Sequence, residues 1–234
     1  MAVGGSSERG AEGSEPVGDG RVAGGPVGGD PVGEGPAAAW VVAGPPGAGK
    51  STVAGALADA LRPHPAVLNK DTLYSAFVAE VLAAHGREAG EREGDWYDVH
   101  AKAHEYGGMT AAAREIRGHG CGVVLVAPFT GQIRDPVRWA DWVAELGGEP
   151  VRLVWVRVDA ATLHDRLVRR GRPRDAGKLA DFGAFAARMR PAEPPPVPHL
   201  AVDTSPGAAP VAEQVAGVIG VTAVTEQRSS GMTE

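Results

Sequence analysis

Short apolar runs alternate with longer stretches of helical spacing between residues 37 and 222. Five runs are mostly apolar and rich in valine, and each predicts a strand: Ala39–Ala43, Ala66–Asn69, Gly122–Ala127, Val151–Val158 and His199–Asp203. Their hydrophobicity is continuous rather than alternating, as in strands that helices cover on both faces. The pattern predicts an α/β domain with a parallel sheet of about five strands, joined by right-handed crossovers.

The segments between these runs have the length and spacing of helices. The predicted helices are Lys50–Leu61, Asp71–Ala84, Tyr97–Arg117, Pro136–Leu146, Ala161–Arg170, Phe182–Met189 and Val211–Val218. The pattern fades after Thr222, so residues 223–234 are predicted to form a flexible C-terminal tail.

Residues 1–36 differ in composition from the rest of the chain. They include twelve glycines and contain no aromatic residue, isoleucine or leucine. Such a segment cannot bury enough apolar surface to offset the entropy lost on ordering. We expect a disordered Gly/Pro-rich tail, followed by one domain over residues 37–222.

Charge and cysteine content narrow the choice of partners. The chain has a formal net charge of −6, and the tail, with six acidic residues against two arginines, carries −4 of it. Without a basic excess, binding to nucleic acid or to an anionic membrane is not favoured. The single cysteine, Cys121, excludes an intramolecular disulfide. No apolar stretch approaches the roughly 18 residues of a membrane span, so a cytoplasmic protein with a small partner is expected; the sequence indicates no oligomeric state.

The strongest motif follows the first predicted strand and opens the first predicted helix. It reads Gly44-Pro45-Pro46-Gly47-Ala48-Gly49-Lys50-Ser51-Thr52 and matches the phosphate-loop pattern G-x-x-x-x-G-K-[ST] in full. Glycines let backbone N–H groups turn inward around phosphate oxygens, and the helix N-terminus adds positive potential. We expect these nine residues to bind nucleotide, with Lys50 on the β- and γ-phosphates and the Ser51 hydroxyl on Mg²⁺.

The loop and its surroundings resemble the P-loop kinases of the nucleoside-monophosphate kinase-like group. This group includes gluconate kinase, shikimate kinase, chloramphenicol phosphotransferase and the zeta toxins, beside AAA-type ATP-binding domains. The resemblance covers about residues 39–218. It implies a three-layer P-loop NTPase sandwich with an Arg-rich lid, and an enzyme that uses ATP and Mg²⁺.

An acidic residue follows the second predicted strand, in the run Asn69-Lys70-Asp71-Thr72. Parallel topology brings the end of this strand to the same sheet edge as the phosphate loop. Members of the resembling group often keep an acid there that contacts the acceptor hydroxyl and takes its proton, and Asp71 matches that position. The alternative is an N-cap for a helix that begins near Thr72, and the two roles are compatible.

The third predicted strand ends without an acidic residue, in Val126-Ala127-Pro128. This departs from mechanochemical AAA+ ATPases, in which an acid at this place orders the metal. The loop that follows resembles the polar loop of gluconate kinase-like enzymes, which makes Arg134, Thr130 and Gln132 candidates for the acceptor pocket. The alternative for Arg134 is an ion pair with Asp135 or a helix cap.

Two histidines, His100 and His104, are spaced i, i+4 on a predicted helix. That spacing places both on one face, but no third ligand accompanies them, so a metal site is not expected. Contact with the substrate and a solvated helical face remain the alternatives.

Five arginines lie within the nine positions from Arg166 to Arg174. Arg166 and Arg170 are spaced i, i+4 on the fifth predicted helix, whereas Arg172 and Arg174 follow in a turn predicted to be flexible. Guanidinium groups suit triphosphate oxygens, and the placement is similar to the arginine-bearing lid of the resembling kinases, with Arg166 and Arg170 matching best. A solvated face or a nucleic-acid contact are the alternatives.

These features together predict an ATP-dependent kinase that phosphorylates a hydroxyl group of a small molecule. Lys50 and Mg²⁺ would neutralise the phosphates, Asp71 would orient and deprotonate the acceptor, and Arg166 and Arg170 would close over the transition state. The alternatives are an ATP-binding or ATP-hydrolysing regulatory protein and a polynucleotide 5′-hydroxyl kinase.

Overall fold

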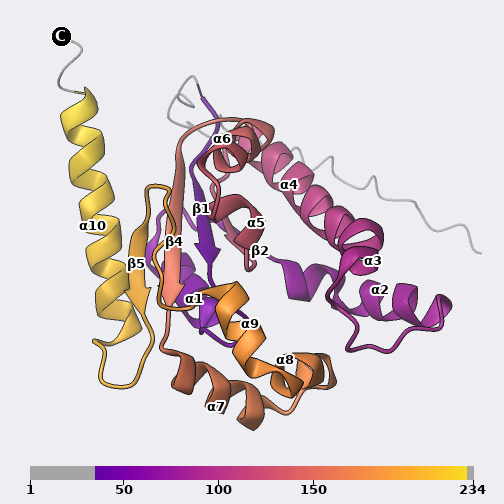
Figure 1. The fold of residues 1–234 in the computed structure, drawn as a ribbon. Helices are drawn as coiled ribbons and strands as arrows, with labels where there is room; N and C mark the ends of the chain where they lie inside the picture. Colours follow the sequence, from indigo (N-terminus) through magenta and orange to yellow (C-terminus); the bar gives the residue numbers. More distant parts are fainter. Residues whose placement is uncertain (1–34, 231–234) are drawn as a thin grey trace, which may run out of the picture. The chain divides into compact units, whose positions relative to one another are not determined.

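The computed structural model describes residues 35–230, with side chains described to residue 222. Five parallel strands form one sheet in the order β2-β3-β1-β4-β5. Their bounds are β1 Ala39–Ala43, β2 Ala66–Asn69, β3 Val123–Val126, β4 Val151–Arg157 and β5 Leu200–Asp203. All five predicted strands are confirmed, and Figure 1 shows helices on both sides of the sheet.

Helices and helical turns connect the strands. They are α1 Lys50–Ala60, α2 Lys70–Ala84, α3 Asp95–Tyr97, a π-helical turn Asp98–Lys102, α4 Ala103–Gly118, α5 Thr130–Ile133, α6 Pro136–Glu145, α7 Ala160–Arg170, a 3₁₀ turn Pro173–Asp175, α8 Ala176–Ala180, α9 Phe182–Met189 and α10 Val211–Ser230. None of the described helices is both long and apolar enough to cross a membrane.

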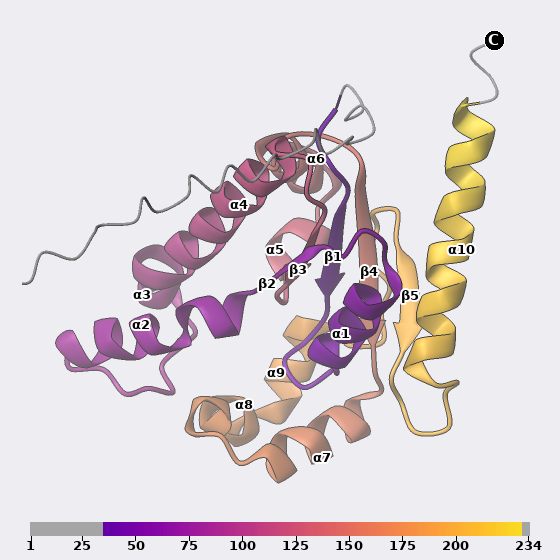
Figure 2. The ribbon, with the colours of Figure 1, turned by 180° about the vertical axis from the view of Figure 1, so that it is seen from behind.

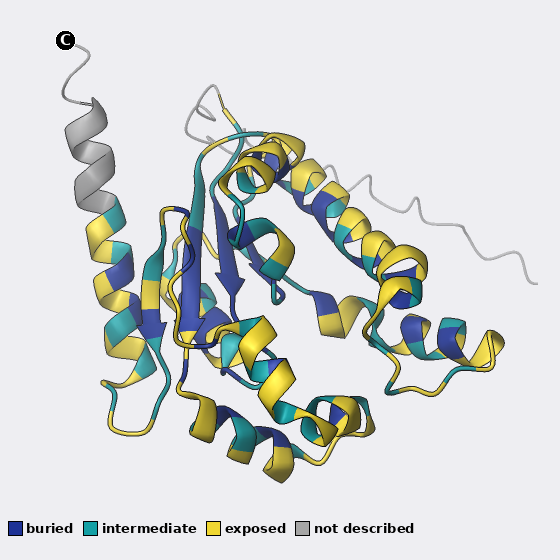
Figure 3. Cartoon of the chain, viewed as in Figure 1, coloured by how far each residue is buried: buried dark blue, intermediate teal, exposed yellow. Residues whose placement is uncertain are grey.

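Side chains of the central strands alternate between two hydrophobic cores. On one face, Trp40 and Val42 of β1 pack with Val53 and Leu57 of α1 and with Val215 of α10. On the other face, the remaining β1 residues pack with residues of α4 and α6. Both faces of β1, β3 and β4 are buried (Figure 3), which explains their continuous hydrophobicity. The helices α1 and α10 cover the first of these two faces, which Figure 2 shows from behind.

Polar residues at the helix ends account for several boundaries. Asp135 caps α6 by accepting from the N–H groups of Val137 and Arg138, ahead of a proline at the first helical position. Asp159 caps α7 in the same way, and α7 ends at Gly171 in the left-handed conformation. These local signals made the two helices predictable.

The structure corrects two predicted helices. The segment predicted as one helix over Tyr97–Arg117 begins at Asp95 and is interrupted by the π-helical turn Asp98–Lys102, a feature that often accompanies functional sites. The last helix was predicted to end at Val218 but continues to Ser230. Residues 1–34 and 231–234 lie outside the described residues, so the disorder of the first tail stays a prediction. Of the predicted C-terminal tail, residues 223–230 continue α10, and the flexibility of the tail also stays a prediction.

The amino ends of the strands are tied together by a buried arginine that the sequence did not reveal. Arg117, at the end of α4, is fully buried. Its guanidinium donates to the carbonyl oxygens of Ala37 (2.6 Å), Leu146 (2.7 Å), Gly148 (2.8 Å) and Pro150 (3.2 Å). It therefore joins the segment before β1 to the segment between α6 and β4. Burial lowers the pKa of Arg117 below its ordinary value, and a weaker attraction from Glu149 opposes this.

Candidate active site

The phosphate loop joins β1 to α1, as the motif predicts. Gly44, Gly47 and Gly49 have φ angles of +145°, +92° and +90°, a region that favours glycine. A side chain at position 44 would also place its Cβ 2.5 Å from the carbonyl oxygen of Val156. The loop curls around its own lysine, because Lys50 Nζ donates to the carbonyl oxygens of Gly44 (2.9 Å) and Pro45 (3.0 Å).

The Lys50 ammonium group has an unusual electrostatic environment. Burial lowers the pKa of Lys50 to about 8; the negative charge of Asp71 opposes this shift, and the positive charges of Arg170, Lys70 and Arg174 add to it. Lys50 and Asp71 therefore interact across the site although 20 residues separate them. An anion that bound between these cations would relieve the repulsion among them.

A cavity of about 900 Å³ extends from the phosphate loop to α2, the π-helical turn and α9. Positively charged side chains dominate its charged lining. The cations are Lys50, Lys70, Arg92, Lys102, Arg166, Arg170, Arg172, Arg174, Lys178 and Arg188, and the acids are Asp71, Glu93, Asp98 and Asp175. Ten cations against four acids, in a chain whose net charge is −6, give this cavity the electrostatics of a polyanion site.

Strand order separates the phosphate loop from Asp71. β3 lies between β1 and β2, and its Val126 is in register with Val42 of β1 and with Asn69 of β2. The chain beyond β3 contributes Ala127, Pro128 and Thr130 to the cavity lining. These residues are small or neutral, so this part of the lining adds no charge between the phosphate loop and Asp71. This is the carboxyl edge of the sheet, where ligands bind in open α/β folds.

Asp71 lies in the first turn of α2 rather than at its cap. The helix begins one residue earlier than predicted, and Asn69 is the N-cap, accepting from the N–H of Asp71 at 3.0 Å. The alternative of Asp71 as an N-cap is therefore wrong, and its carboxylate faces the cavity. Burial alone would raise the pKa of Asp71, but the charges of Arg174 and Lys70 and the hydrogen bond from Arg174 bring it below its ordinary value. The carboxyl group is ionised at neutral pH.

The arginine segment, residues 166–174, borders the phosphate loop. Arg166 donates to the Thr204 hydroxyl at 3.1 Å and to its carbonyl oxygen, and that hydroxyl donates to the carbonyl oxygen of Ala48 at 2.7 Å. Arg170 Nε donates to Asp175 Oδ2 at 2.8 Å. Arg172 and Arg174 also line the cavity, whereas the exposed Arg169 does not. Arg169 thus lies on the solvated face of α7; Arg172 is exposed as well but borders the cavity, and the lid stays a prediction.

Several polar residues of the cavity wall were not predicted, because their partners are far apart in the sequence. Lys70 Nζ lies 2.7 Å from Glu105 Oε1, and the Tyr97 hydroxyl donates to Glu105 Oε2 at 2.5 Å. Asp175 is 1% exposed and lies within 3.5 Å of Lys178 Nζ as well as contacting Arg170. The sequence offered one general guide to these residues: a charged residue that is buried in an apolar domain needs a partner.

The residues around Ser51 offer a limited set of metal ligands. The Ser51 hydroxyl accepts from Asn69 Nδ2 at 3.4 Å, and no acidic residue ends β3. Across the described residues, no three His, Cys, Asp or Glu side chains are grouped as metal ligands. The donor set fits a Mg²⁺ ion held by Ser51 and by nucleotide oxygens, and not an ion held by protein side chains alone.

Four residues suggested for the acceptor side do not line the cavity. Arg134 donates to the carbonyl oxygens of Arg190 (3.0 Å) and Pro194 (3.2 Å), and so holds the loop after α9. His100 stacks on Trp96 with ring centroids 4.8 Å apart and, like His104, is exposed. Gln132 does not line the cavity either, whereas Thr130 does.

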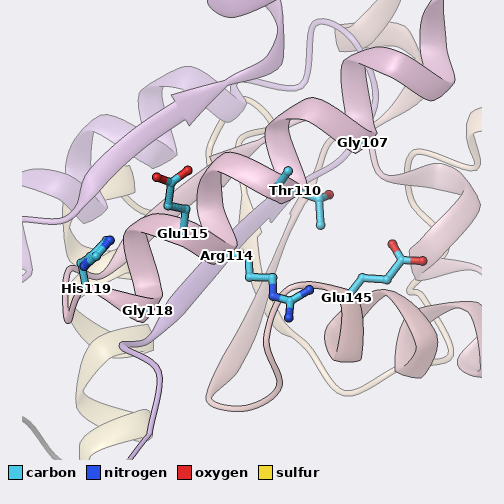
Figure 4. Close-up of a pocket in the computed structure, with 8 residues that line it drawn as sticks. Gly107, Thr110, Arg114, Glu115, Gly118, His119 and Glu145 are labelled. Atoms are coloured by element: carbon cyan, nitrogen blue, oxygen red, sulfur yellow. The ribbon is translucent and has the colours of Figure 1, made fainter.

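A second hollow, of about 580 Å³, lies over α4 and the end of α6 (Figure 4). Its lining includes Arg114, Glu115 and His119 of the α4 region and Glu145 of α6. None of the predicted site residues lines it, and Thr110, which does, already accepts a hydrogen bond from the Trp142 indole at 2.9 Å. This hollow is separate from the phosphate loop and its cavity.

Comparison with known proteins agrees with this arrangement. The AAA domain family matches residues 40–195, and no curated protein matches the sequence. Three solved structures share the fold at low identity. A candidate kinase from Chloroflexus aurantiacus is 20% identical with a TM-score of 0.55 and covers 79% of this chain and 97% of its own. A sugar kinase from Janibacter is 13% identical with a TM-score of 0.53, and the match covers 79% of this chain and 94% of the kinase. A gluconokinase from Sinorhizobium meliloti is 17% identical with a TM-score of 0.50, and the match covers 85% of this chain and 98% of the gluconokinase.

Proposed function

The chain belongs to the AAA domain family, and we propose that it is an ATP-dependent phosphotransferase that phosphorylates a hydroxyl group of a small molecule. One observation carries this proposal: the phosphate-loop lysine and the ionised Asp71 carboxylate face one cavity and interact electrostatically. A phosphate loop binds the donor, and an ionised acid across from it is suited to accept the proton of a hydroxyl group that binds beside the donor. The sugar kinase and the gluconokinase with this fold support the same reading.

Transfer is proposed to proceed in line. The acceptor hydroxyl oxygen attacks the γ-phosphorus, the bond from that phosphorus to the β–γ bridging oxygen breaks, and ADP leaves. The hydroxyl proton passes to the Asp71 carboxylate, which also orients the hydroxyl. Arg174 donates to Asp71 Oδ2, and the acceptor hydroxyl is proposed to displace it from that oxygen.

The cations of the cavity supply the charge neutralisation that phosphoryl transfer requires. The phosphates would draw Lys50 Nζ away from the Gly44 and Pro45 carbonyl oxygens, while Arg166 and Arg170 would act as a lid over the transferring group. Mg²⁺, bound through Ser51 and the phosphates, would add further positive charge. Thr204 and Asp175 fix the two arginines, so little reorganisation would be needed in the transition state.

The test is phosphoryl transfer from γ-labelled ATP with Mg²⁺ to a panel of hydroxylated metabolites, antibiotics and a 5′-hydroxyl oligonucleotide. Wild type is compared with Lys50→Ala and Asp71→Asn, and with Arg169→Ala and Asp165→Asn as matched controls on exposed positions of α7. Transfer to a small molecule that both site variants lose and both controls keep is the expected result.

Two outcomes would contradict the proposal. Release of inorganic phosphate in a Lys50-dependent manner, unchanged by Asp71→Asn and by every acceptor, would favour the regulatory ATPase. Transfer to the oligonucleotide alone would favour the polynucleotide kinase, which the net charge of −6 does not suit.

A further inference from the structure

Lys70 contacts both the proposed proton acceptor, Asp71, and a carboxylate in the protein interior, Glu105. Its Nζ lies 2.7 Å from Glu105 Oε1 and 3.7 Å from Asp71 Oδ1. The side chain is 10% exposed, and it lines the cavity beside Asp71. A single ammonium group therefore lies between a carboxylate of the interior and the carboxylate of the site.

Glu105 fixes the position of this ammonium group. The Glu105 side chain is 2% exposed, and its second oxygen accepts a hydrogen bond from the buried Tyr97 hydroxyl. Burial, with the hydrogen bond to Glu105, raises the pKa of Tyr97 well above its ordinary range, so this hydroxyl stays a donor at every working pH. Lys70 is thus attached to α4 and α3 as well as to its own helix, and its long side chain has little freedom.

The second cation on Asp71 has a different character. Arg174 Nη2 lies 2.7 Å from Asp71 Oδ2 but belongs to the 3₁₀ turn of the arginine segment. In the proposed mechanism Arg174 must give up an Asp71 oxygen to the acceptor hydroxyl. Lys70 can keep its contact with Asp71, because it lies beside the other oxygen and is held by Glu105.

We propose that Lys70 is a positioning residue that keeps the Asp71 carboxylate oriented and ionised when the acceptor displaces Arg174, and that Glu105 and Tyr97 hold Lys70 in place for this purpose. The inference rests on the proposed function, because it assigns Lys70 a role in the same reaction. It identifies a buried chain of three side chains that connects α3 and α4 to the reacting edge of the sheet.

Every charged group around Asp71 bears on its titration. Lys70 contacts it from the same helix, Arg174 contacts it from the 3₁₀ turn, and Lys50 acts on it from α1. In the proposed mechanism the acceptor does not displace Lys70 from Asp71. Replacing Lys70 therefore removes a positive charge that would act on Asp71 while the acceptor is bound. The Asp71 carboxyl group should therefore retain its proton to higher pH, and activity that needs the ionised form should be lost at a higher pH on the acid side.

The decisive experiment combines a carboxyl titration with kinetics. The titration of Asp71 is followed by ¹³C NMR in full-length wild type, Lys70→Met, Lys70→Arg and the double variant Lys70→Met/Glu105→Gln, without nucleotide. The double variant guards against misfolding, because it leaves no unpaired charge at position 105 and keeps an acceptor for the Tyr97 hydroxyl. Kinetic constants are then measured for any acceptor that the panel identifies.

The expected result is an Asp71 titration shifted to higher pH in both Lys70→Met variants, and shifted back toward wild type in Lys70→Arg. The kcat for transfer should fall about 100-fold, which is the loss typical of a misplaced catalytic group, while the affinity for ATP stays within about twofold. The acid limb of the pH profile should move in the same direction as the NMR titration.

An Asp71 titration that is unchanged in a folded Lys70→Met variant would overturn the inference, and would leave the Lys70–Glu105 pair as a structural connection between α2 and α4. Equal losses of kcat and ATP affinity would overturn it too, since Lys70 would then act on the nucleotide. If wild type phosphorylates no acceptor, the proposed function fails by itself, and the NMR arm still decides whether Lys70 controls Asp71.

Discussion

Arg174 of the arginine segment is paired with Asp71, with 2.7 Å between Nη2 and Oδ2, although 103 residues separate them in the sequence. Arg174 also donates to the Ser75 hydroxyl at 3.3 Å. The segment proposed to bind phosphate therefore contacts the carboxylate proposed to bind the acceptor. The acceptor would bind Asp71 and the nucleotide would bind Arg174, so either ligand would break this ion pair.

Arg174→Gln tests the pair directly. The variant should shift the Asp71 titration to higher pH, because the strongest charge that lowers the pKa of Asp71 is removed. The folded-state pKa of Asp71 is lowered, so the stabilisation is present at neutral pH and is lost as pH falls below about 4. The Asp71 side chain is 47% exposed, so the free energy of unfolding should fall by less than about 1 kcal/mol at pH 7. Urea denaturation at pH 7 and pH 3 measures this, and an equal deficit at both values would contradict it.

Lys50→Met should separate stability from nucleotide binding. Burial lowers the pKa of Lys50 to about 8, so the charged form is less favourable in the folded chain than in the unfolded chain. Below pH 8 the variant should be more stable than wild type by about 1 kcal/mol, since the loss of two hydrogen bonds offsets part of the relief. The free energy of unfolding of wild type should rise between pH 8 and pH 10.5. The difference in stability between Lys50→Met and wild type should therefore become smaller over this range.

Thermal unfolding across this pH range, with ATP titrations alongside, tests the Lys50→Met prediction. The variant should bind no ATP at concentrations that saturate wild type. A variant that is less stable than wild type at pH 7 would show that the hydrogen bonds to the Gly44 and Pro45 carbonyl oxygens outweigh the cost of burying the charge.

Arg166 and Arg169 form a matched pair on α7. Arg166 lines the cavity and is fixed by Thr204, whereas Arg169 is exposed and lies outside the cavity lining. Arg166→Ala should reduce phosphoryl transfer by about 100-fold or more, because a guanidinium aimed at the transition state is lost. Arg169→Ala should stay within about twofold of wild type. Equal losses in the two variants would show that general positive charge, and not position, matters.

Asp175→Asn should destabilise the arginine segment. The carboxylate is 1% exposed and is the counter-charge of both Arg170 and Lys178. The substitution keeps the shape but removes the counter-charge of Arg170 and leaves Lys178 with Glu93 alone, at 4.0 Å, at a cost of about 2 kcal/mol in the free energy of unfolding. Chemical denaturation measures the loss, and Asp165→Asn on the exposed face of α7 is the control. A deficit below about 0.5 kcal/mol would mean that solvent already screens these cations.

Local patterns were enough for the framework of the fold and for the donor side of the site. The strands are covered on both faces and therefore carry continuous apolar runs, and Asp135 and Asp159 mark helix starts that need no tertiary information. The phosphate loop is contiguous in sequence, so its glycines and Lys50 are visible together. Asp71 was found from topology, because a residue that follows a parallel strand must lie at the loop's edge of the sheet.

Residues whose partners lie far along the chain could not be found in this way. Glu105 is 35 residues from Lys70, and Thr204 is 38 residues from Arg166. Arg134, on the other hand, was a candidate because the loop after β3 resembles the polar loop of gluconate kinase-like enzymes, but its guanidinium binds carbonyl oxygens of the loop after α9. Position after a strand indicates an edge of the sheet; the direction of a long side chain depends on packing.

Arg117 has a consequence for how proteins of this kind can diverge. One guanidinium saturates four carbonyl oxygens from the segment before β1 and from the segment between α6 and β4. An insertion or deletion in either segment would pull an oxygen out of reach and leave a buried cation unsatisfied. Arg117 sets no such limit on the connections around α2, α3 and α8, at the opposite edge of the sheet. Those connections surround the cavity, so the side chain that fixes one end of the sheet sets no limit on the length of the loops at the other end, where the acceptor is proposed to bind.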